Sequence, residues 1–539
     1  MESAKSENTR NSQSSPSPGK EQPEAGYPSR LSLSLIALGL CLAVFCFALD
    51  QTIVANAIPR ITDEFDSVAD IGWYGSSFLL ATSAFQLFYG TAYSYFSIKS
   101  TFLIATGLFE LGSLLCAVAP SSTAFIIGRA VAGLGGSGIM GGALVIIAHS
   151  VPLRRRPLFI GAIGAMFGIA SVCGPLLGGV FTDRLTWRWC FYINLPFGAI
   201  TVIAVALFFK PPRRPAVDSL PFLTKMKKLD WLGMFFFVPS IVSLLLALQW
   251  GGSTYPWDSG RIIALFVVFA VLGFAFGFVE YKRKDQAILP PSIITQRSIA
   301  AAAWYSFFNG AAFLVVIYYT PLWHQVVRQV SAVESGIRLL PMIVGNVVMV
   351  MISGCLVTVI GYYAPFMLVS TILTPISEGL LSTWTVDATF SQWFGYEAFA
   401  GIAFGAGMQQ PVMAVQTVLP IDQIPIGTSL VVFMQTLGAA VFVSVAQSVF
   451  SNQLIADLKQ FAGLGGGGFN PTDFLSAGAT NVFNKIPPQL VRPFLDAFNH
   501  AVTRVYIISI CCSSLTLIGS LAMEYKSVKN GKKKEETAA

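Results

Sequence analysis

Charge is scarce in this sequence, because Asp, Glu, Lys and Arg together make up only 11% of its 539 residues. Water-soluble domains carry about 25% charged residues. Hydrophobic residues make up 54% of the chain, and they form runs of about 20 residues, each enough for a helix across a core of roughly 30 Å. The strands of a β-barrel would alternate in polarity over about ten residues. The composition therefore predicts an all-α polytopic membrane protein and excludes a β-barrel.

Motifs for nucleotide and metal chemistry are also lacking. The chain has no G-x-x-x-x-G-K-[ST] phosphate loop and no H-E-x-x-H zinc motif. A G-x-G-x-x-G match at 133–138 lies inside an apolar run, whereas a dinucleotide site needs a strand before it. The three histidines are scattered over the chain, so we expect no metal site and no cofactor apart from a proton gradient. They are His149, His324 and His500.

Cysteines and basic residues do not indicate an extracellular scaffold or a nucleic-acid partner. The eight cysteines fall inside or at the edges of the apolar runs, so no disulfide framework is expected. The formal charge of +7 comes from residues between apolar runs, not from a basic face of a soluble domain. The expected surroundings are therefore a lipid bilayer, with no nucleic acid bound.

The apolar runs predict about fourteen membrane spans. Basic residues concentrate in alternate connections, as in the Arg154–Arg156 turn, and the positive-inside rule then places both termini in the cytoplasm. An even number of spans satisfies that placement. The expected spans lie at about 33–58, 71–95, 101–119, 122–149, 157–181, 190–210, 231–249, 261–280, 299–320, 336–360, 363–381, 396–419, 426–451 and 504–524.

The spans divide into groups of six, two and six, which predicts two six-helix bundles around a binding site and two additional helices between them in the sequence. The long outer loop at 452–503 is expected to contain a short amphipathic element. The expected parts are a disordered cytoplasmic tail at 1–30, the first bundle at 31–210, a linker with two helices at 211–298, the second bundle at 299–524 and a basic cytoplasmic tail at 525–539.

Three ionisable residues lie at lipid depth in the first half. A charge at mid-span costs roughly 2.5–3.5 kcal/mol on insertion scales, so Arg129 should face the bundle interior and find a partner. With a rise of about 1.5 Å per residue, Asp50 and Glu110 reach a similar depth. A carboxylate whose distance from a cation changes with conformation loads and releases a proton. Proton coupling by these residues is our hypothesis, and a static ion pair is the alternative.

Glycines with i, i+4 spacing follow in the fifth span, where they let helix backbones approach closely. A proline among them removes a helix hydrogen bond and can bend the helix. We expect conformational gating at a contact between the two halves, and static packing is the alternative. The set is Gly164, Gly168, Gly174, Pro175, Gly178 and Gly179.

Amide and aromatic side chains and one carboxylate in the second half are the candidate lining of a substrate cavity for amphipathic organic molecules. Interhelical hydrogen bonds and aromatic belts at the membrane interface are the alternative for each residue. The candidates are Phe308, Asn309, Asn346, Glu378, Gln409, Gln410 and Gln435.

Several of these segments resemble a known family. The segment Leu49–Pro59 (LDQTIVANAIP) resembles the first-span signature of the fourteen-span drug:proton antiporters of the major facilitator superfamily. The segment Arg129–Gly135 is similar to the fourth-span arginine motif linked to proton coupling. The segment Gly161–Gly179, ending GPLLGG, resembles the fifth-span antiporter motif, and Trp187–Gly198 resembles the beginning of the sixth span.

The resemblance covers most of the chain and implies the major facilitator fold with alternating access. One loop departs from it. The family pattern GxLaDrxGRK after the second span keeps only Gly90 and Lys99, and Ser94 occupies the Asp position. A charge-relay gate at that loop is therefore in doubt.

The whole chain is similar to fungal efflux carriers of secondary metabolites, such as mycotoxin exporters. This implies a monomeric, proton-driven exporter of a small amphipathic toxin or drug in the plasma membrane, with vacuolar and vesicle membranes as alternatives. A proton-coupled importer of a siderophore or other nutrient is the second reading. A membrane enzyme, against which the missing motifs argue, and a sensor without transport remain open.

Overall fold

The computed structural model describes residues 27–67, 70–212, 214–252, 254–462 and 491–529. In these ranges twelve helices are long and apolar enough to cross a membrane. Two more, α2 (Ile71–Tyr95) and α17 (Phe390–Gly407), pack inside the bundles but have less apolar sequences. With these two, the number of membrane-length helices reaches the predicted fourteen.

The first bundle contains six long helices and one short one. Glycines of α4 allow its close packing, because a Cβ atom at Gly133 or Gly135 would overlap the backbone of α2 or α3. The glycine run that matches a dinucleotide motif is thus a helix-packing surface. The helices are α1 (Arg30–Phe65), α2, α3 (Ile98–Ala117), α4 (Ser122–Ser150), α5 (Arg156–Arg184), α6 (Trp189–Tyr192) and α7 (Asn194–Phe208).

The second bundle is built in the same way. Its fourth long helix is interrupted after α17, where Pro411 lies in the first turn of α18 and cannot donate a backbone hydrogen bond. The helices are α13 (Arg297–Val327), α14 (Ala332–Arg338), α15 (Leu340–Ile360), α16 (Ala364–Ser382), α17, α18 (Gln410–Val418), α19 (Ile424–Ala462) and α21 (Val491–Ala522).

The prediction of an outer loop at 452–503 is wrong at both ends, because long helices extend into this range. Residues 452–462 continue α19, and residues 491–503 form the first part of α21. Apolar side chains explain the extension, since Phe450 and Phe498 meet at 5.2 Å between ring centroids and Leu454 is buried beside them. The rest of the expected amphipathic element lies outside the described residues.

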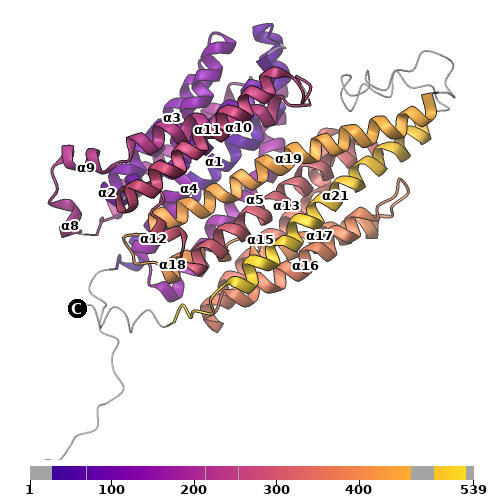
Figure 1. Ribbon diagram of the computed structural model, residues 1–539. Helices are drawn as coiled ribbons and strands as arrows, with labels where there is room; N and C mark the ends of the chain where they lie inside the picture. The colour runs from indigo at the N-terminus through magenta and orange to yellow at the C-terminus, as the bar shows by residue number, and fades with distance from the viewer. Residues whose placement is uncertain (1–26, 68–69, 213, 253, 463–490, 530–539) are drawn as a thin grey trace, which may run out of the picture.

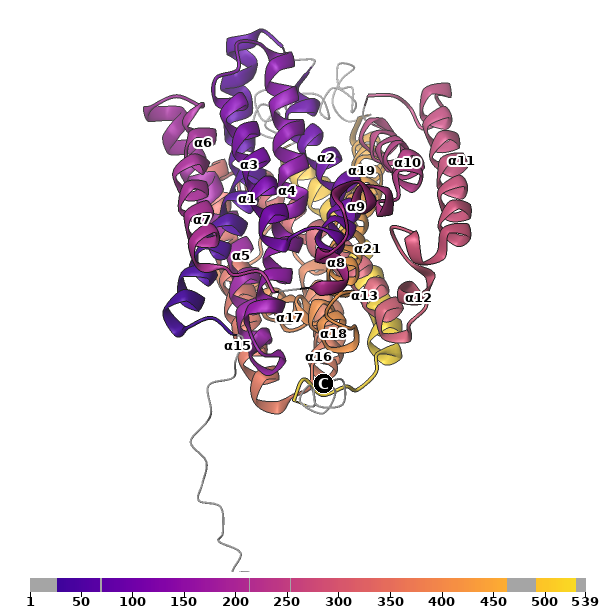
Figure 2. The ribbon, with the colours of Figure 1, turned by 90° about the vertical axis from the view of Figure 1, so that its left-hand side faces the viewer.

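The two helices between the bundles in sequence are peripheral in space. Helix α10 (Trp231–Trp250) packs against α2 and α19, with Phe237 and Phe433 in contact at 5.4 Å between ring centroids. Helix α11 (Gly260–Arg283) packs mainly on α10, and only 6% of its apolar stretch is buried. Figure 2 shows α11 at the outer edge of the molecule. In a membrane, lipid covers that face.

Short helices lie in the connections on either side of this pair. The basic linker before α10 holds α8 and α9, and the segment after α11 leads through α12 into the second bundle. Their bounds are Pro215–Asp218 for α8, Phe222–Lys228 for α9 and Pro291–Ile294 for α12.

The two bundles are joined at one end of the molecule, here called the basic end because it holds the Leu153–Arg155 turn between α4 and α5. One hydrophobic core crosses between the bundles there, with Leu144 and Ile147 of α4 in the same cluster as Val415 of α18. Toward the opposite end, each bundle has a separate core. Figure 1 shows the bundles diverging from the basic end. The described conformation is therefore closed at the basic end.

Candidate functional site

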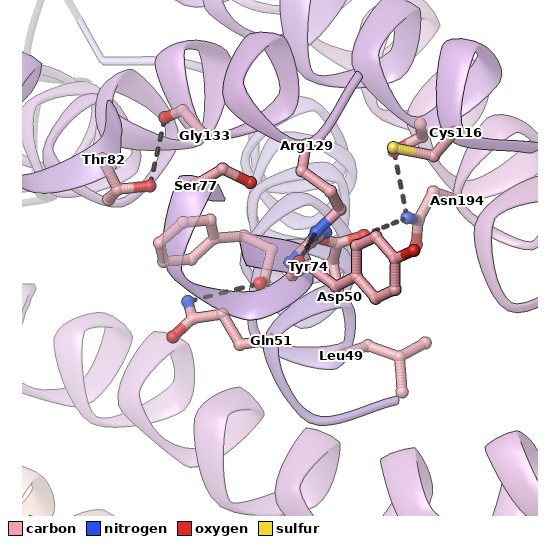
Figure 3. A network of polar contacts seen from close by, with 12 residues as sticks. Leu49, Asp50, Gln51, Tyr74, Ser77, Thr82, Cys116, Arg129, Gly133 and Asn194 are labelled. Carbon is pink, nitrogen blue, oxygen red and sulfur yellow. Dashed lines mark hydrogen bonds and ion pairs between the residues drawn. The ribbon is translucent and has the colours of Figure 1, made fainter. Parts of the chain in front are cut away.

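The centre of the first bundle holds a buried ion pair between α1 and α4. Asp50 and Arg129 form this pair, and their side chains are 0% and 1% exposed. The Arg129 Nε atom also donates a 2.9 Å hydrogen bond to the backbone carbonyl of Tyr74 on α2 (Figure 3). The guanidinium lies 4.5 Å from the ring centroid of Phe78 and 5.9 Å from that of Phe191. Ring faces stabilise a desolvated cation, so the arginine is held on several sides.

Asn194 at the start of α7 extends this network. Its Nδ2 atom lies 3.4 Å from an Asp50 carboxylate oxygen and 3.1 Å from the Ser113 hydroxyl of α3. Breaking a buried ion pair by removing one member costs about 3–5 kcal/mol, because the other charge remains without compensation. The Tyr74 carbonyl and the Phe78 ring also contact Arg129, so they offset part of that cost for the arginine.

Glu110 lies one turn of α3 from Ser113, toward the basic end. Its carboxylate packs against Gly198 of α7, where a Cβ atom would overlap it. Its Oε2 atom is buried without a hydrogen-bond partner among the described residues. Glu110 is therefore beside the Asp50 network and outside its hydrogen bonds.

The expected gating residues divide between two contacts. Gly164 faces the Gln409 side chain and Gly168 faces Val347, so this part of α5 lies between the bundles. Gly174 instead packs against Thr52 of α1 within its own bundle, and Pro175 lies near α14.

The other expected gating glycines are at the far end of α5. Gly178 is buried and Gly179 is half-buried, and α5 runs through Pro175 without ending. Helical spacing predicted one face of small residues on α5. That face contacts the second bundle at Gly168 and contacts α1 of the first bundle at Gly174.

A small cleft with a cavity volume of about 20 Å³ lies where α5 meets the second bundle. Of the predicted cavity residues, Asn346 lines this cleft, and its amide approaches Met408 Sδ at 3.8 Å. Mostly apolar side chains complete the lining, which comes from both bundles. The lining residues are Gly164, Phe167, Gly168, Ser171, Phe313, Ile317, Met342, Ile343, Asn346 and Met408.

The other predicted cavity residues are not among those lining residues. The Glu378 carboxyl accepts hydrogen bonds from Ser509 and Ser513 of α21. Gln410 donates to the Ser353 hydroxyl at 3.3 Å. The remaining members are Phe308, in tilted ring contact with Trp304 and Phe442, Asn309, buried in α13, Gln409, opposite Gly164, and Gln435, whose backbone lies against Gly310.

The loop that departs from the family pattern is held by the linker. The Arg214 guanidinium donates to the carbonyls of Tyr93 at 3.0 Å and Ser94 at 3.1 Å, and to that of Phe96. Burial lowers the pKa of Arg214, and the nearby Asp218 and Asp422 carboxylates oppose that effect. Arg214 thus satisfies carbonyls that the end of α2 leaves without helical partners.

Replacing Arg214 with alanine is expected to lower the free energy of unfolding by on the order of 2 kcal/mol, because hydrogen bonds to a charged group are lost. Thermal unfolding in detergent measures the change. Lys210→Ala, at an exposed position in the same linker, is the control. Equal melting temperatures for the two variants would contradict the assigned role of Arg214.

The sequence profile of the Major Facilitator Superfamily matches residues 40–443. The chain belongs to the major facilitator superfamily. Solved structures with the same fold include the proton:xylose symporter XylE, with a TM-score of 0.56 and 14% identity over 93% of this chain and 98% of that one. The human organic anion transporter MFSD10 gives a TM-score of 0.55 and 15% identity over 90% and 99% of the two chains.

Fungal efflux pumps are much more similar in sequence. The MFS-type efflux pump MFS1 of Arthroderma benhamiae is 50% identical, with 94% of both chains covered. The efflux pump aflT of Aspergillus parasiticus is 48% identical, with 94% of this chain and 98% of that one covered. The aspyridones efflux protein of Neocamarosporium betae is 47% identical over 95% and 90%. The protein is therefore a multi-pass membrane transporter of a family rich in efflux pumps, not an enzyme.

Most of the groups around Arg129 cannot be predicted from the sequence. The Asn194-Leu195-Pro196 segment stands out only through its family resemblance, and no sequence pattern marks Phe78 or Ser113. Their roles depend on which helix faces are in contact, which a single sequence does not specify.

Proposed function

We propose that this transporter exports small amphipathic organic compounds, secondary metabolites or drugs, in exchange for protons. The buried ion pair of Asp50 and Arg129 is the observation that supports this proposal most. An ionisable pair at lipid depth is expensive, and in membrane proteins such residues mark proton and substrate pathways. Relatives named as efflux pumps support the direction of transport.

In this mechanism Asp50 binds the proton. Protonation neutralises the carboxylate and weakens its attraction to Arg129, whose charge is then held by the Tyr74 carbonyl and the Phe78 ring. Because α1 also packs against α5, a shift of α1 is transmitted to the contact between bundles. Glu110 is the second acceptor in the path, one turn away on α3.

The proposed cycle alternates closure of the two ends. With both termini in the cytoplasm, the basic end faces the cytoplasm and the described conformation opens outward. Substrate binds between the bundles, at the cleft next to Gly164 and Asn346, where apolar side chains dominate the lining. We place the transporter in the plasma membrane, with vacuolar or vesicle membranes as the alternative sites.

The proposal is tested in inside-out membrane vesicles with an acidic lumen, using rhodamine 6G and a panel of amphipathic fungal metabolites. Accumulation in the lumen should require the pH gradient and disappear when nigericin collapses it. Accumulation that is independent of the gradient for each transported compound would contradict proton exchange. Efflux from the lumen together with protons would instead establish the importer.

A further inference from the structure

A second pair of ionisable side chains is buried in the second bundle. His324 of α13 and Glu397 of α17 approach at 2.7 Å between Nε2 and Oε1, and both are 0% exposed. No sequence pattern indicates this pair, because the two residues are 73 positions apart. The pair lies toward the end of the bundle opposite the basic end, near α14.

The pair has vacant polar positions. His324 Nδ1, Glu397 Oε2 and the indole nitrogen of Trp384 are buried without hydrogen-bond partners among the described residues. Aromatic rings surround the imidazole, with centroid distances of 5.1 Å to Trp323, 6.0 Å to Trp384 and 5.1 Å to Trp393. One proton is shared between Nε2 and Oε1, and the two free atoms can accept another. With that single proton the pair carries a net charge of −1, and a second proton makes it neutral.

Charged groups from neighbouring segments set the free energy of binding a second proton to the pair. Arg338 of α14 lies over the Trp393 ring at 5.6 Å, and its Nε atom donates to Glu334 at 3.1 Å. Arg328 at the end of α13 lies 5.8 Å from the Trp323 ring centroid and donates to two carbonyls of the 386–388 loop.

Two further titratable groups complete the surroundings. Asp387 is held as a carboxylate, since the hydrogen bond from Arg492 lowers its pKa. Tyr506 of α21 shares a hydrogen bond of 3.0 Å with the Thr320 hydroxyl. The two arginines therefore favour the anionic form of the pair and oppose uptake of the second proton, and both acidic groups near them are engaged in ion pairs with arginine.

Helix α14 connects this pair to the other bundle. It carries Arg338, and its Gly336 lies against Pro175 of α5. We propose that His324 and Glu397 form a second proton-binding site, which takes up a proton when α14 moves and Arg338 is carried away from it. The inference rests on the proposed proton coupling, and it adds a proton site in the second bundle to the one at Asp50.

The test uses the full-length protein in liposomes that contain a pH-sensitive dye. It measures rhodamine 6G exchange between pH 5 and 8 and the protons moved per substrate. His324→Gln and Glu397→Gln should keep substrate exchange without a gradient, flatten the pH profile and reduce the number of protons moved. Arg338→Gln should shift the midpoint of the pH profile to higher pH, because a cation that opposes proton uptake is removed.

His500→Gln is the matched control, since His500 forms a similar 2.8 Å pair with Asp457 but is 45% exposed. It should reproduce the wild-type pH profile.

If the wild type moves no protons, the proposed function fails, and the second site fails with it. If the wild type is coupled but all three variants keep its profile and proton count, only the second site is refuted. If His324→Gln and Glu397→Gln lower the melting temperature but leave the pH profile of exchange unchanged, the pair has only a structural role. If His324→Gln and Glu397→Gln do not fold, the test rests on Arg338→Gln, and an unchanged midpoint of its pH profile would refute the second site.

Discussion

Replacing Asp50 with asparagine is expected to reduce gradient-driven export to the background of protein-free liposomes. Asparagine has nearly the same shape as aspartate, but it cannot bind and release a proton in the range in which transport operates. It also leaves Arg129 buried without an anion, at a cost below the roughly 3–5 kcal/mol of a broken buried pair, because the Tyr74 carbonyl and the Phe78 ring still contact the guanidinium. Export driven by an imposed pH gradient and thermal unfolding are measured on the same preparation.

Two further variants separate coupling from folding. Glu64 is on the same helix as Asp50, and Glu64→Gln removes only a partly exposed ion pair with Arg188, so this variant should retain both export and stability. Asp50→Asn combined with Arg129→Gln removes both charges and should recover stability without recovering proton-driven export. Full gradient-driven export by either Asp50→Asn protein would exclude Asp50 as the proton carrier.

Replacing Gly354 with leucine is expected to prevent full closure of the basic end. A Cβ atom at this position would lie 2.6 Å from the carbonyl oxygen of Pro157, across the contact of α15 with α5. Overpacking of this kind costs about 1–3 kcal/mol. The cost applies only to the closed arrangement, so the conformational equilibrium should shift by roughly 5- to 150-fold, and export should fall accordingly.

Spin-label distances between α5 and α15 at the basic end measure that shift, and export is assayed in parallel. Gly107→Leu on α3 is the control, because nothing lies within 4 Å of a Cβ atom built there. The role of the α5–α15 contact would be refuted by a Gly354→Leu protein with the distance distribution and export rate of the wild type.

The sequence predicts how deep a side chain lies in the membrane, but it does not predict which side chains of other helices it contacts. A constant rise along each helix predicted that Asp50 and Arg129 reach the same level, and the ion pair is present. Depth does not give the rotation of a helix or its neighbour. Asn194 and Phe78 were therefore missed, and Gly174 proved to face α1 rather than the second bundle.

By itself the sequence determined the membrane class and the helical fold, because apolar runs of membrane length have no other stable arrangement in lipid. Tertiary structure alone decided which ionisable groups meet. The pairs His324–Glu397 and His500–Asp457 join residues far apart in the chain. The closed basic end and the peripheral place of α11 were likewise decided by side-chain packing between helices, since hydrophobicity alone does not distinguish a lipid contact from a helix contact.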